Sequence, residues 1–327
     1  MYSGGEGIRV LITGAQGFVG PYVISSLRRI CGPDIVLFPT AKDAANDPAT
    51  GSDLSLDITD RASVEDALLR CNPTHVIHLA GIAAPAAASA NPDAAWQVNV
   101  LGTLNLARAI LDKAPHCWLL NIGSGLIYGE SAKSGQPLDE NALVAPLDDY
   151  AVTKASADLA LGALVRRGLK CIRFRPFNHS GAGQTDAFVL PAFAKQIAWI
   201  EHGHTEPVIR VGNLDAERDF LDVRDVADAY ALAVKNCEAL AAGSIINIAS
   251  GKPRRIGDLL QQLLALSSVH ITAEPDPAQY RPIDLPRVVG NADRAHKLLG
   301  WTPHYPIEET LAAVLDDYRA RLTRQQR

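Results

Sequence analysis

Tyr150 and Lys154 stand four residues apart in the segment DDYAVTK, at the beginning of a stretch with a helical pattern. In a helix this spacing places the two side chains on one face. A phenol has an unperturbed pKa of about 10, and a neighbouring ammonium group favours the phenolate and lowers that pKa. The spacing therefore predicts a tyrosine that donates or accepts a proton in catalysis.

A serine completes this candidate catalytic set. Ser124 follows the apolar segment WLLNI, and its hydroxyl could donate a hydrogen bond to a substrate carbonyl oxygen. A tyrosine and a lysine four residues apart are usually an accident of sequence. The serine and an earlier glycine turn, in the same chain and in the expected order, are what indicate a catalytic role.

The glycine turn lies in IRVLITGAQGFVG, where Gly14, Gly17 and Gly20 come directly after the first apolar run. Glycines there permit a tight turn and let backbone N–H groups approach a pyrophosphate, which the following helix N-terminus also favours. The spacing is G-x-x-G-x-x-G, not the commoner G-x-G-x-x-G. A plain glycine-rich turn is the alternative, but the position predicts a dinucleotide site. Its predicted residues also include Gln16, Phe18 and Val19.

The end of the second apolar run bears on the choice of dinucleotide. An acidic residue there would bind the ribose hydroxyls of NAD, whereas a basic residue would accommodate the 2′-phosphate of NADP. The segment FPTAK has no acid before Asp43, so Thr40 and Lys42 are predicted to hold that phosphate, favouring NADP(H) over NAD(H). Lys42 could equally be a solvated loop lysine. Asp57, followed by Ile58, either accepts from the adenine amino group or caps the next helix.

Composition narrows the class of protein. The chain has 327 residues, of which 47% are hydrophobic, enough for a sizeable core. A net charge of −5 without a basic run predicts neither nucleic acid nor an anionic membrane as a partner. The five cysteines are widely spaced, so neither a metal site nor a disulfide framework is expected. No signal peptide or membrane span is recognisable, which predicts a cytoplasmic protein.

The elements that must position these residues follow a regular alternation. Short apolar runs alternate with helical patterns, which is typical of a parallel sheet with helices on both faces. We therefore predict an α/β fold with a Rossmann-like, doubly wound parallel sheet. The expected strands are residues 9–13, 35–38, 75–80, 118–122, 171–175 and 244–248, and the expected helices are residues 20–29, 62–70, 99–109 and 150–167.

The alternation is lost after Pro176, where the chain becomes richer in proline, glycine, histidine and arginine. This change predicts a smaller C-terminal substrate lobe. We assign residues 1–177 and 222–250 to the dinucleotide-binding domain, and residues 178–221 and 251–327 to the lobe.

The combined motifs resemble a known family. The glycine turn, HLAG at 78–81, Asn99, Ser124 with the Tyr128-Gly129 pair, and the Tyr150/Lys154 pair are similar to the extended short-chain dehydrogenases that act on nucleotide sugars. The resemblance covers essentially the whole chain. It implies catalytic roles for Ser124, Tyr150 and Lys154. It also implies cofactor contacts for Leu79, Ala80 and Gly81 over the pyrophosphate, a structural and cofactor-shell role for Asn99, and a position for Pro176 beside the nicotinamide.

Four strings in the second half narrow this resemblance to the GDP-4-keto-6-deoxymannose reductases, with the GDP-mannose 4,6-dehydratases as nearest relatives. They are RPFNHSGAGQ (175–184), FAKQI (193–197), EPVIRVGNLDAERDFLDVRDV (206–226) and RPIDLP (281–286). The resemblance implies that Arg218 and Arg281 hold a nucleotide diphosphate, which a guanidinium fork suits. Each could instead form a surface ion pair, for example with Asp219 or Asp284. The other implied substrate-site residues are Asn178, Lys195, Asn213 and Asp284.

The chain also departs from its relatives. The dehydratases carry a glutamate base two residues before the tyrosine that matches Tyr128, but the residue here is Leu126, which disfavours dehydration. Asp148 and Asp149 replace the usual Ser-Pro before Tyr150. They would raise its pKa if they faced it, but we expect them to point to solvent and cap the helix. The loop 82–89 is apolar, whereas relatives often carry Ser, Lys or Asp there to contact the sugar. The identity of the hexose therefore does not follow from the resemblance.

The resemblance implies reduction of a GDP-linked 4-keto-6-deoxyhexose to GDP-rhamnose or its C4 epimer. A nucleotide-sugar 4-epimerase with retained NAD is an alternative. A non-catalytic dinucleotide sensor is another, against which the intact Ser–Tyr–Lys set argues. Helices 99–113 and 150–167 commonly pair with their copies in this family, which implies a homodimer.

Overall fold

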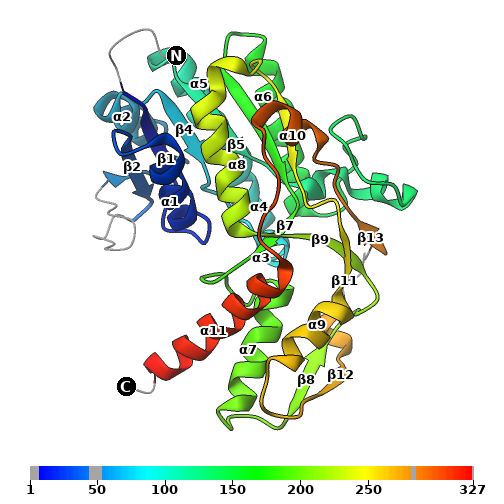
Figure 1. Cartoon of the computed structure of the whole chain (residues 1–327). Helices are drawn as coiled ribbons and strands as arrows, with labels where there is room; N and C mark the ends of the chain where they lie inside the picture. The colour runs from blue at the N-terminus through cyan, green and yellow to red at the C-terminus, as the bar shows by residue number, and fades with distance from the viewer. Residues whose placement is uncertain (1–6, 44–53, 281–284, 326–327) are drawn as a thin grey trace.

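The computed structural model describes residues 7–43, 54–280 and 285–325. Its centre is a seven-stranded sheet in the order β10-β6-β5-β4-β1-β2-β3, in which all the paired strands run parallel (Figure 1). The predicted α/β fold with a doubly wound parallel sheet is confirmed. The strands are β1 (Arg9–Thr13), β2 (Val36–Ala41), β3 (Leu54–Ser55), β4 (His75–His78), β5 (Trp118–Ile122), β6 (Cys171–Pro176) and β10 (Ile245–Ile248).

Alternate residues of each strand face two separate cores, because successive side chains of a strand point to opposite faces. Val10 and Ile12 of β1 lie in the core that α1 (Gly20–Cys31) and α8 (Val223–Asn236) cover. Leu11 lies in the opposite core. That second core is covered by α2 (Arg61–Cys71), α5 (Thr103–Lys113) and α6 (Asp149–Val165).

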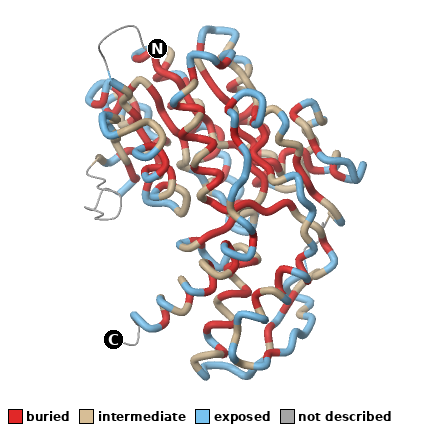
Figure 2. The backbone as a smooth tube through the Cα atoms, viewed as in Figure 1, coloured by how far each residue is buried: buried red, intermediate tan, exposed pale blue. Residues whose placement is uncertain are grey.

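A second layer lies beyond the carboxyl ends of the strands. Its helices are α7 (Val189–Glu201), α9 (Ile256–Ala265) and α11 (Ile307–Gln325), which share a core of their own. Figure 1 shows these helices below the sheet, and Figure 2 shows buried residues alternating with exposed ones along them. Its strands are β7 (Asn178–Ser180), β8 (Val208–Val211), β9 (Glu217–Asp222), β11 (Pro253–Arg255), β12 (Thr272–Pro275) and β13 (Arg287–Val288).

This layer is more regular than its composition suggested. Leu190, Phe193, Ala194 and Ile197 of α7 recur at helical spacing and are all buried. Prolines and glycines between the elements hide this periodicity in the sequence. The C-terminal chain also returns to the sheet, because α10 (Asp293–Leu299) packs against α8 and β10. The two domain limits stay a prediction.

Helix α6, which carries Tyr150 and Lys154, is joined to the sheet by a buried ion cluster. Asp158 is 1% exposed and pairs with Arg173 at 3.0 Å and with Arg175 at 2.9 Å, both on β6. Arg175 also donates to the Tyr128 hydroxyl at 3.0 Å, and that hydroxyl donates to Asn247 Oδ1 of β10 at 2.7 Å. The cluster thereby connects α6 with two strands.

Replacement of Asp158 with alanine should destabilise the protein strongly. It would leave the buried Arg175 and the partly exposed Arg173 without their carboxylate, and breaking a buried ion pair costs about 3–5 kcal/mol. The free energy of unfolding, measured by urea titration, should fall by that amount. The matched control is Asp149→Ala on the same helix, where the aspartate is exposed. Equal effects of the two substitutions would contradict a structural role for the cluster.

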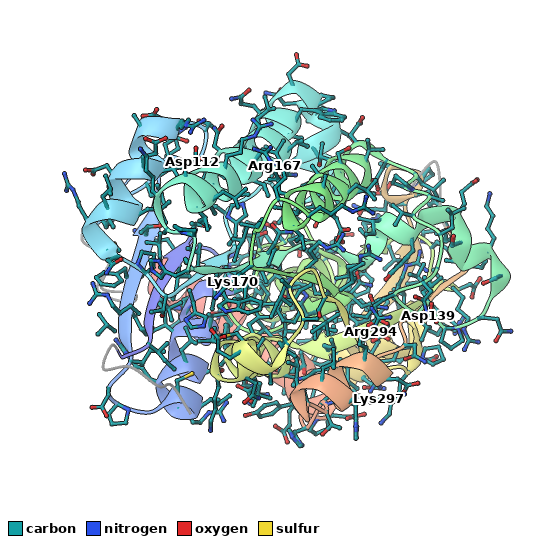
Figure 3. All side chains as sticks on the ribbon, turned by 90° about the horizontal axis from the view of Figure 1, so that it is seen from above. Asp112, Asp139, Arg167, Lys170, Arg294 and Lys297 are labelled. Atoms are coloured by element: carbon teal, nitrogen blue, oxygen red, sulfur yellow. The ribbon has the colours of Figure 1, made fainter. Side chains whose placement is uncertain are left out.

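The opposite edge of the sheet, where the strands begin, carries charged side chains. Figure 3 shows it from above, with Arg167 and Lys170 between α6 and β6, and with Arg294 and Lys297 on α10. Arg294 donates to the backbone carbonyl of Ile245 at 3.0 Å. This edge lies away from the predicted catalytic residues.

Candidate active site

A cleft of about 890 Å³ lies along the carboxyl edge of the sheet. In an open parallel sheet, ligands bind at this edge. The cleft is lined by the glycine turn, by the segment that follows β5 and by the beginning of α6. Residues of the second layer line the rest. The fold therefore brings the three groups of predicted site residues to a single cavity.

The glycine turn is held close to the end of β4. Gly14 has φ +68°, and a Cβ on it would lie 2.7 Å from the Cα of Ala80. A Cβ on Gly20 would collide with the carbonyl of Ala15. Both positions exclude a side chain, so this backbone can present its N–H groups to an anion at the beginning of α1. The predicted residues Gln16, Phe18 and Val19 line the cleft beside it.

Ser124 and Tyr150 meet in the middle of the cleft. Tyr150 is 7% exposed, and its hydroxyl is hydrogen-bonded to Ser124. Burial raises the pKa of Tyr150 to about 12, and the Asp148 carboxylate adds to this shift, while the hydrogen bond with Ser124 opposes it. The expected lowering of this pKa by Lys154 is not what the structure shows, because the shift comes first from desolvation of the phenolate and Lys154 does not contribute to it. The phenol is protonated at neutral pH.

Lys154 lies beside this pair. Its ammonium group donates to the carbonyl of Ile122, at the end of β5, at 3.1 Å. Burial lowers the pKa of Lys154 to about 8. The Nζ atom also lies next to the loop after β4, since a Cβ on Gly81 would be 3.4 Å from it. A ribose held over this loop would find the ammonium group within reach.

Asp148 and Asp149, the two aspartates before Tyr150, differ in position and in their effect on the phenol. Asp148 is the N-cap of α6 and accepts a hydrogen bond from Ala151 N at 2.7 Å, as predicted. It also raises the pKa of Tyr150, so it is close enough to act on the phenol. Asp149 is exposed.

Asn99 supports the site from behind. It is 2% exposed and lies in a π-helical turn, Trp96–Gly102, a rare conformation that is frequent at functional sites. Its side chain exchanges hydrogen bonds with the backbone of Ile82 and donates to Thr153 Oγ1 at 3.1 Å. It therefore joins the loop after β4 to α6. Asn99 is not among the residues that line the cleft.

The predicted 2′-phosphate residues behave differently from each other. The Thr40 side chain is fully buried, and its hydroxyl donates to the carbonyl of Ile12 at 3.0 Å, so its predicted phosphate contact is wrong. Lys42 lines the cleft, with a side chain 70% exposed, and its ammonium group lies 3.0 Å from Asp57. Asp57 does not cap α2, whose N-cap is Asp60.

The remaining predicted cofactor residues line the same cleft. They are Asp57, Ile58, Leu79, Ala80, Gly81 and Pro176. Their contacts with a cofactor stay predictions. The geometry that supports them is the side-chain-free turn at Gly14.

The second layer supplies the predicted substrate residues. Asn178, Asn213 and Arg218 line the cleft. Lys195 is not among the lining residues, and its ammonium group pairs with Asp186, which is, at 2.6 Å. Arg281 and Asp284 lie outside the described residues.

Some lining residues were not predicted. His179 stacks on Phe18 of the glycine turn, with ring centroids 6.1 Å apart, and its Nδ1 donates to the carbonyl of Phe177 at 3.0 Å. The imidazole therefore connects the turn with the second layer. Its position beside Asn178 was the only sequence signal. Others are Phe188, Gln196, Arg210 and Gln279.

The comparisons with known proteins agree with this geometry. Residues 10–249 match the model of the NAD dependent epimerase/dehydratase family. The chain belongs to that family. It is 34% identical over 315 residues to GDP-6-deoxy-D-mannose reductase of Pseudomonas aeruginosa, covering 96% of this chain and 98% of the relative. It is 27% identical to GDP-6-deoxy-D-talose 4-dehydrogenase of Aggregatibacter actinomycetemcomitans, covering 96% and 98%.

Solved structures give the same result. The structure of RMD from Pseudomonas aeruginosa complexed with NADPH has a TM-score of 0.83 and 32% identity, covering 96% of this chain and 99% of that one.

Within the described residues no group of three or more His, Cys, Asp or Glu could hold a metal ion, and no helix could span a membrane. The chain is an enzyme of a family whose members use a nicotinamide dinucleotide.

The glycine turn can be tested by Gly14→Ala. An alanine at this positive φ is strained, and its Cβ would collide with Ala80. The turn would shift and lose at least one charge-assisted hydrogen bond to the dinucleotide, so the affinity should fall at least about tenfold. Fluorescence titration with NADPH and with NADH measures it. Gly32→Ala is the control, because Gly32 also has a positive φ but nothing lies within 4 Å of a Cβ there. An unchanged affinity in Gly14→Ala would contradict this site.

Proposed function

We propose that this enzyme reduces the 4-keto group of GDP-4-keto-6-deoxy-D-mannose with NAD(P)H, forming GDP-D-rhamnose or its C4 epimer. The observation that carries the proposal is the Ser124–Tyr150–Lys154 set in the middle of a cleft that joins the glycine turn to Arg218. The 34% identity to a GDP-6-deoxy-D-mannose reductase supports the substrate class.

Each residue of the set has a distinct role in this proposal. A bound nicotinamide supplies the hydride. Tyr150 donates its proton to the oxygen at C4, and Ser124 stabilises the charge that develops on that oxygen. Lys154 holds the ribose hydroxyls. The pKa of Tyr150, raised to about 12, suits reduction because the phenol carries the proton that the product needs.

Dehydration is disfavoured. Water elimination needs a carboxylate base beside the sugar, and Leu126 occupies that position in the wall of the cleft. Among the described lining residues the only carboxylates are Asp57, near the glycine turn, and Asp186, which pairs with Lys195. Neither belongs to the segment that carries Ser124.

A nucleotide-sugar 4-epimerase is the second candidate. UDP-glucose 4-epimerase of Rhizobium leguminosarum is 24% identical over 95% of this chain, and that of Thermus thermophilus in complex with NAD has a TM-score of 0.82. Such an enzyme oxidises and then reduces the same carbon, so it copurifies with NAD and consumes no net NADPH.

For the cofactor we propose NADP(H) over NAD(H). Within this chain the proposal depends on Lys42. Its ammonium group, exposed at the rim of the cleft beside Asp57, could turn toward a 2′-phosphate. The similar Pseudomonas structure holds NADPH. In the same proposal Arg218, with Arg281, binds the GDP diphosphate, and Asn213 lines the GDP site. Binding of the nucleotide positions the sugar for reaction.

The reaction is tested by incubating the purified enzyme with GDP-4-keto-6-deoxymannose and either NADPH or NADH, and by identifying the product by NMR. Tyr150→Phe should lower kcat by about 10²–10⁴, the usual contribution of a general acid. Tyr230→Phe is the control, since the buried Tyr230 hydroxyl has no hydrogen-bond partner in the described chain. Full turnover in Tyr150→Phe would refute the mechanism.

We also propose a homodimer formed by the helices beside the site. The π-helical turn packs against α6, and both expose large apolar side chains: Trp96 is 42%, Leu101 46% and Leu159 60% exposed. Exposed apolar side chains on two helices that pack together suit an interface, where a partner would cover them.

Leu159→Glu should convert the dimer to a monomer, because it places a charge in the apolar interface. Analytical ultracentrifugation measures the mass. Leu298→Glu is the control, as Leu298 is 41% exposed on α10, which packs against α8 and β10 instead. A dimer that persists in Leu159→Glu would show that the interface lies elsewhere.

A further inference from the structure

A second cavity, of about 500 Å³, lies at the beginning of α11. Phe220 of β9 lines both this cavity and the catalytic cleft. The rest of its wall differs from that of the cleft. It consists of Leu221, Asp222, Ser250, Lys252, Arg254 and residues 303–308.

Three basic side chains line this cavity: Lys252, Arg254 and His304. The described part of the chain provides no hydrogen bond or ion pair to the side chains of Lys252 and Arg254. The Nε atom of Arg254 is buried and has no partner there. Burial of an unpaired guanidinium N–H is costly, so the folded chain by itself leaves a donor that a ligand could satisfy.

The strand pairing places a second charge near Arg254. In the antiparallel pair of β11 and β9, Arg254 lies directly opposite Arg218. A bound anion beside Arg254 would bring a negative charge close to this pair of guanidinium groups.

Another part of the wall, the loop before α11, is held rigidly by hydrogen bonds. Asp225 accepts hydrogen bonds from His304 N at 2.9 Å and from Tyr305 N at 3.1 Å, which fixes the loop before α11. Arg224 forms two 2.8 Å hydrogen bonds with Asp222 and stacks on the Tyr305 ring at 3.7 Å. The cavity is therefore shaped in advance, which lowers the entropic cost of binding.

The charge balance of the cavity is positive. Asp222 is already paired with Arg224, so Glu308 is the lining carboxylate left against Lys252 and Arg254. The N-terminus of α11, a helix of 19 residues, adds its partial positive charge.

We propose that this cavity binds a phosphate or diphosphate group of a small molecule, at a site separate from the catalytic cleft. Arg254 and Lys252 supply the charge-assisted hydrogen bonds, and the α11 N-terminus supplies the field. Because Phe220 lies in the walls of both cavities and Arg218 shares strand β9, occupancy of this site acts on the nucleotide half of the cleft.

The test is calorimetric titration with the cleft first saturated with NADPH and GDP. The titrants are inorganic phosphate, pyrophosphate and ribose 5-phosphate, which separate a free anion from the phosphate of an organic molecule. Wild-type enzyme should bind at least one of them saturably. Lys252→Ala/Arg254→Ala should bind it at least about tenfold more weakly, because each charge-assisted hydrogen bond contributes that much.

Two controls sharpen the result. Arg167→Ala/Lys297→Ala removes the same net charge from the exposed residues labelled in Figure 3 and should bind as wild type does. Arg254→Gln keeps a polar side chain and replaces the double variant if that variant does not fold. Reductase activity without added phosphate should be unchanged, since neither residue lines the cleft.

Absence of saturable binding by the wild type would overturn the proposal, as would equal binding by the double variant or an equal loss in the charge control. None of these outcomes depends on which sugar the enzyme reduces. Failure of this proposal is therefore distinguishable from failure of the proposed function.

Discussion

The position of α6 against the sheet rests on one carboxylate, that of Asp158. It is buried with Arg173 and Arg175 of β6, and the same helix carries Tyr150 and Lys154 two turns and one turn earlier. A buried ion cluster has one satisfying geometry, because each charge must keep its partners. This cluster therefore helps to fix the position of the catalytic side chains, although the cluster itself takes no part in the reaction.

Burial gives the site its acid–base character. The interior disfavours the charged form of each group, so the pKa of Tyr150 rises and that of Lys154 falls. The Lys154 ammonium group keeps its proton near neutral pH, because its lowered pKa of about 8 is still above the pH. The phenol remains an acid with a hydrogen bond to Ser124, which suits a step that ends in proton donation.

The cleft combines two parts of the fold with different tasks. The sheet provides the glycine turn and the catalytic set at strand ends that share one edge. The second layer provides arginine and asparagine side chains, which suit a phosphate-bearing ligand. His179, stacked on Phe18, is one contact between the two parts inside the cleft. Relative movement of the layers would alter both ligand sites together.

Local sequence determined the features that depend on neighbours along the chain. The glycines of the turn, the spacing of Tyr150 and Lys154, and strands such as Arg9–Thr13 and Trp118–Ile122 were predictable, because turn geometry, helical period and apolar runs are local properties. The family resemblance added the order of the motifs, and the comparisons confirm the family.

Only the tertiary structure decided how polar groups share partners. It buried the Thr40 hydroxyl against Ile12 and paired Lys195 with Asp186. It raised the pKa of Tyr150, where its spacing from Lys154 suggested the opposite. The helices of the second layer were not predicted from the sequence and are seen only in the structure. Desolvation and pairing depend on residues far apart in the chain, and no local pattern records which of them will meet.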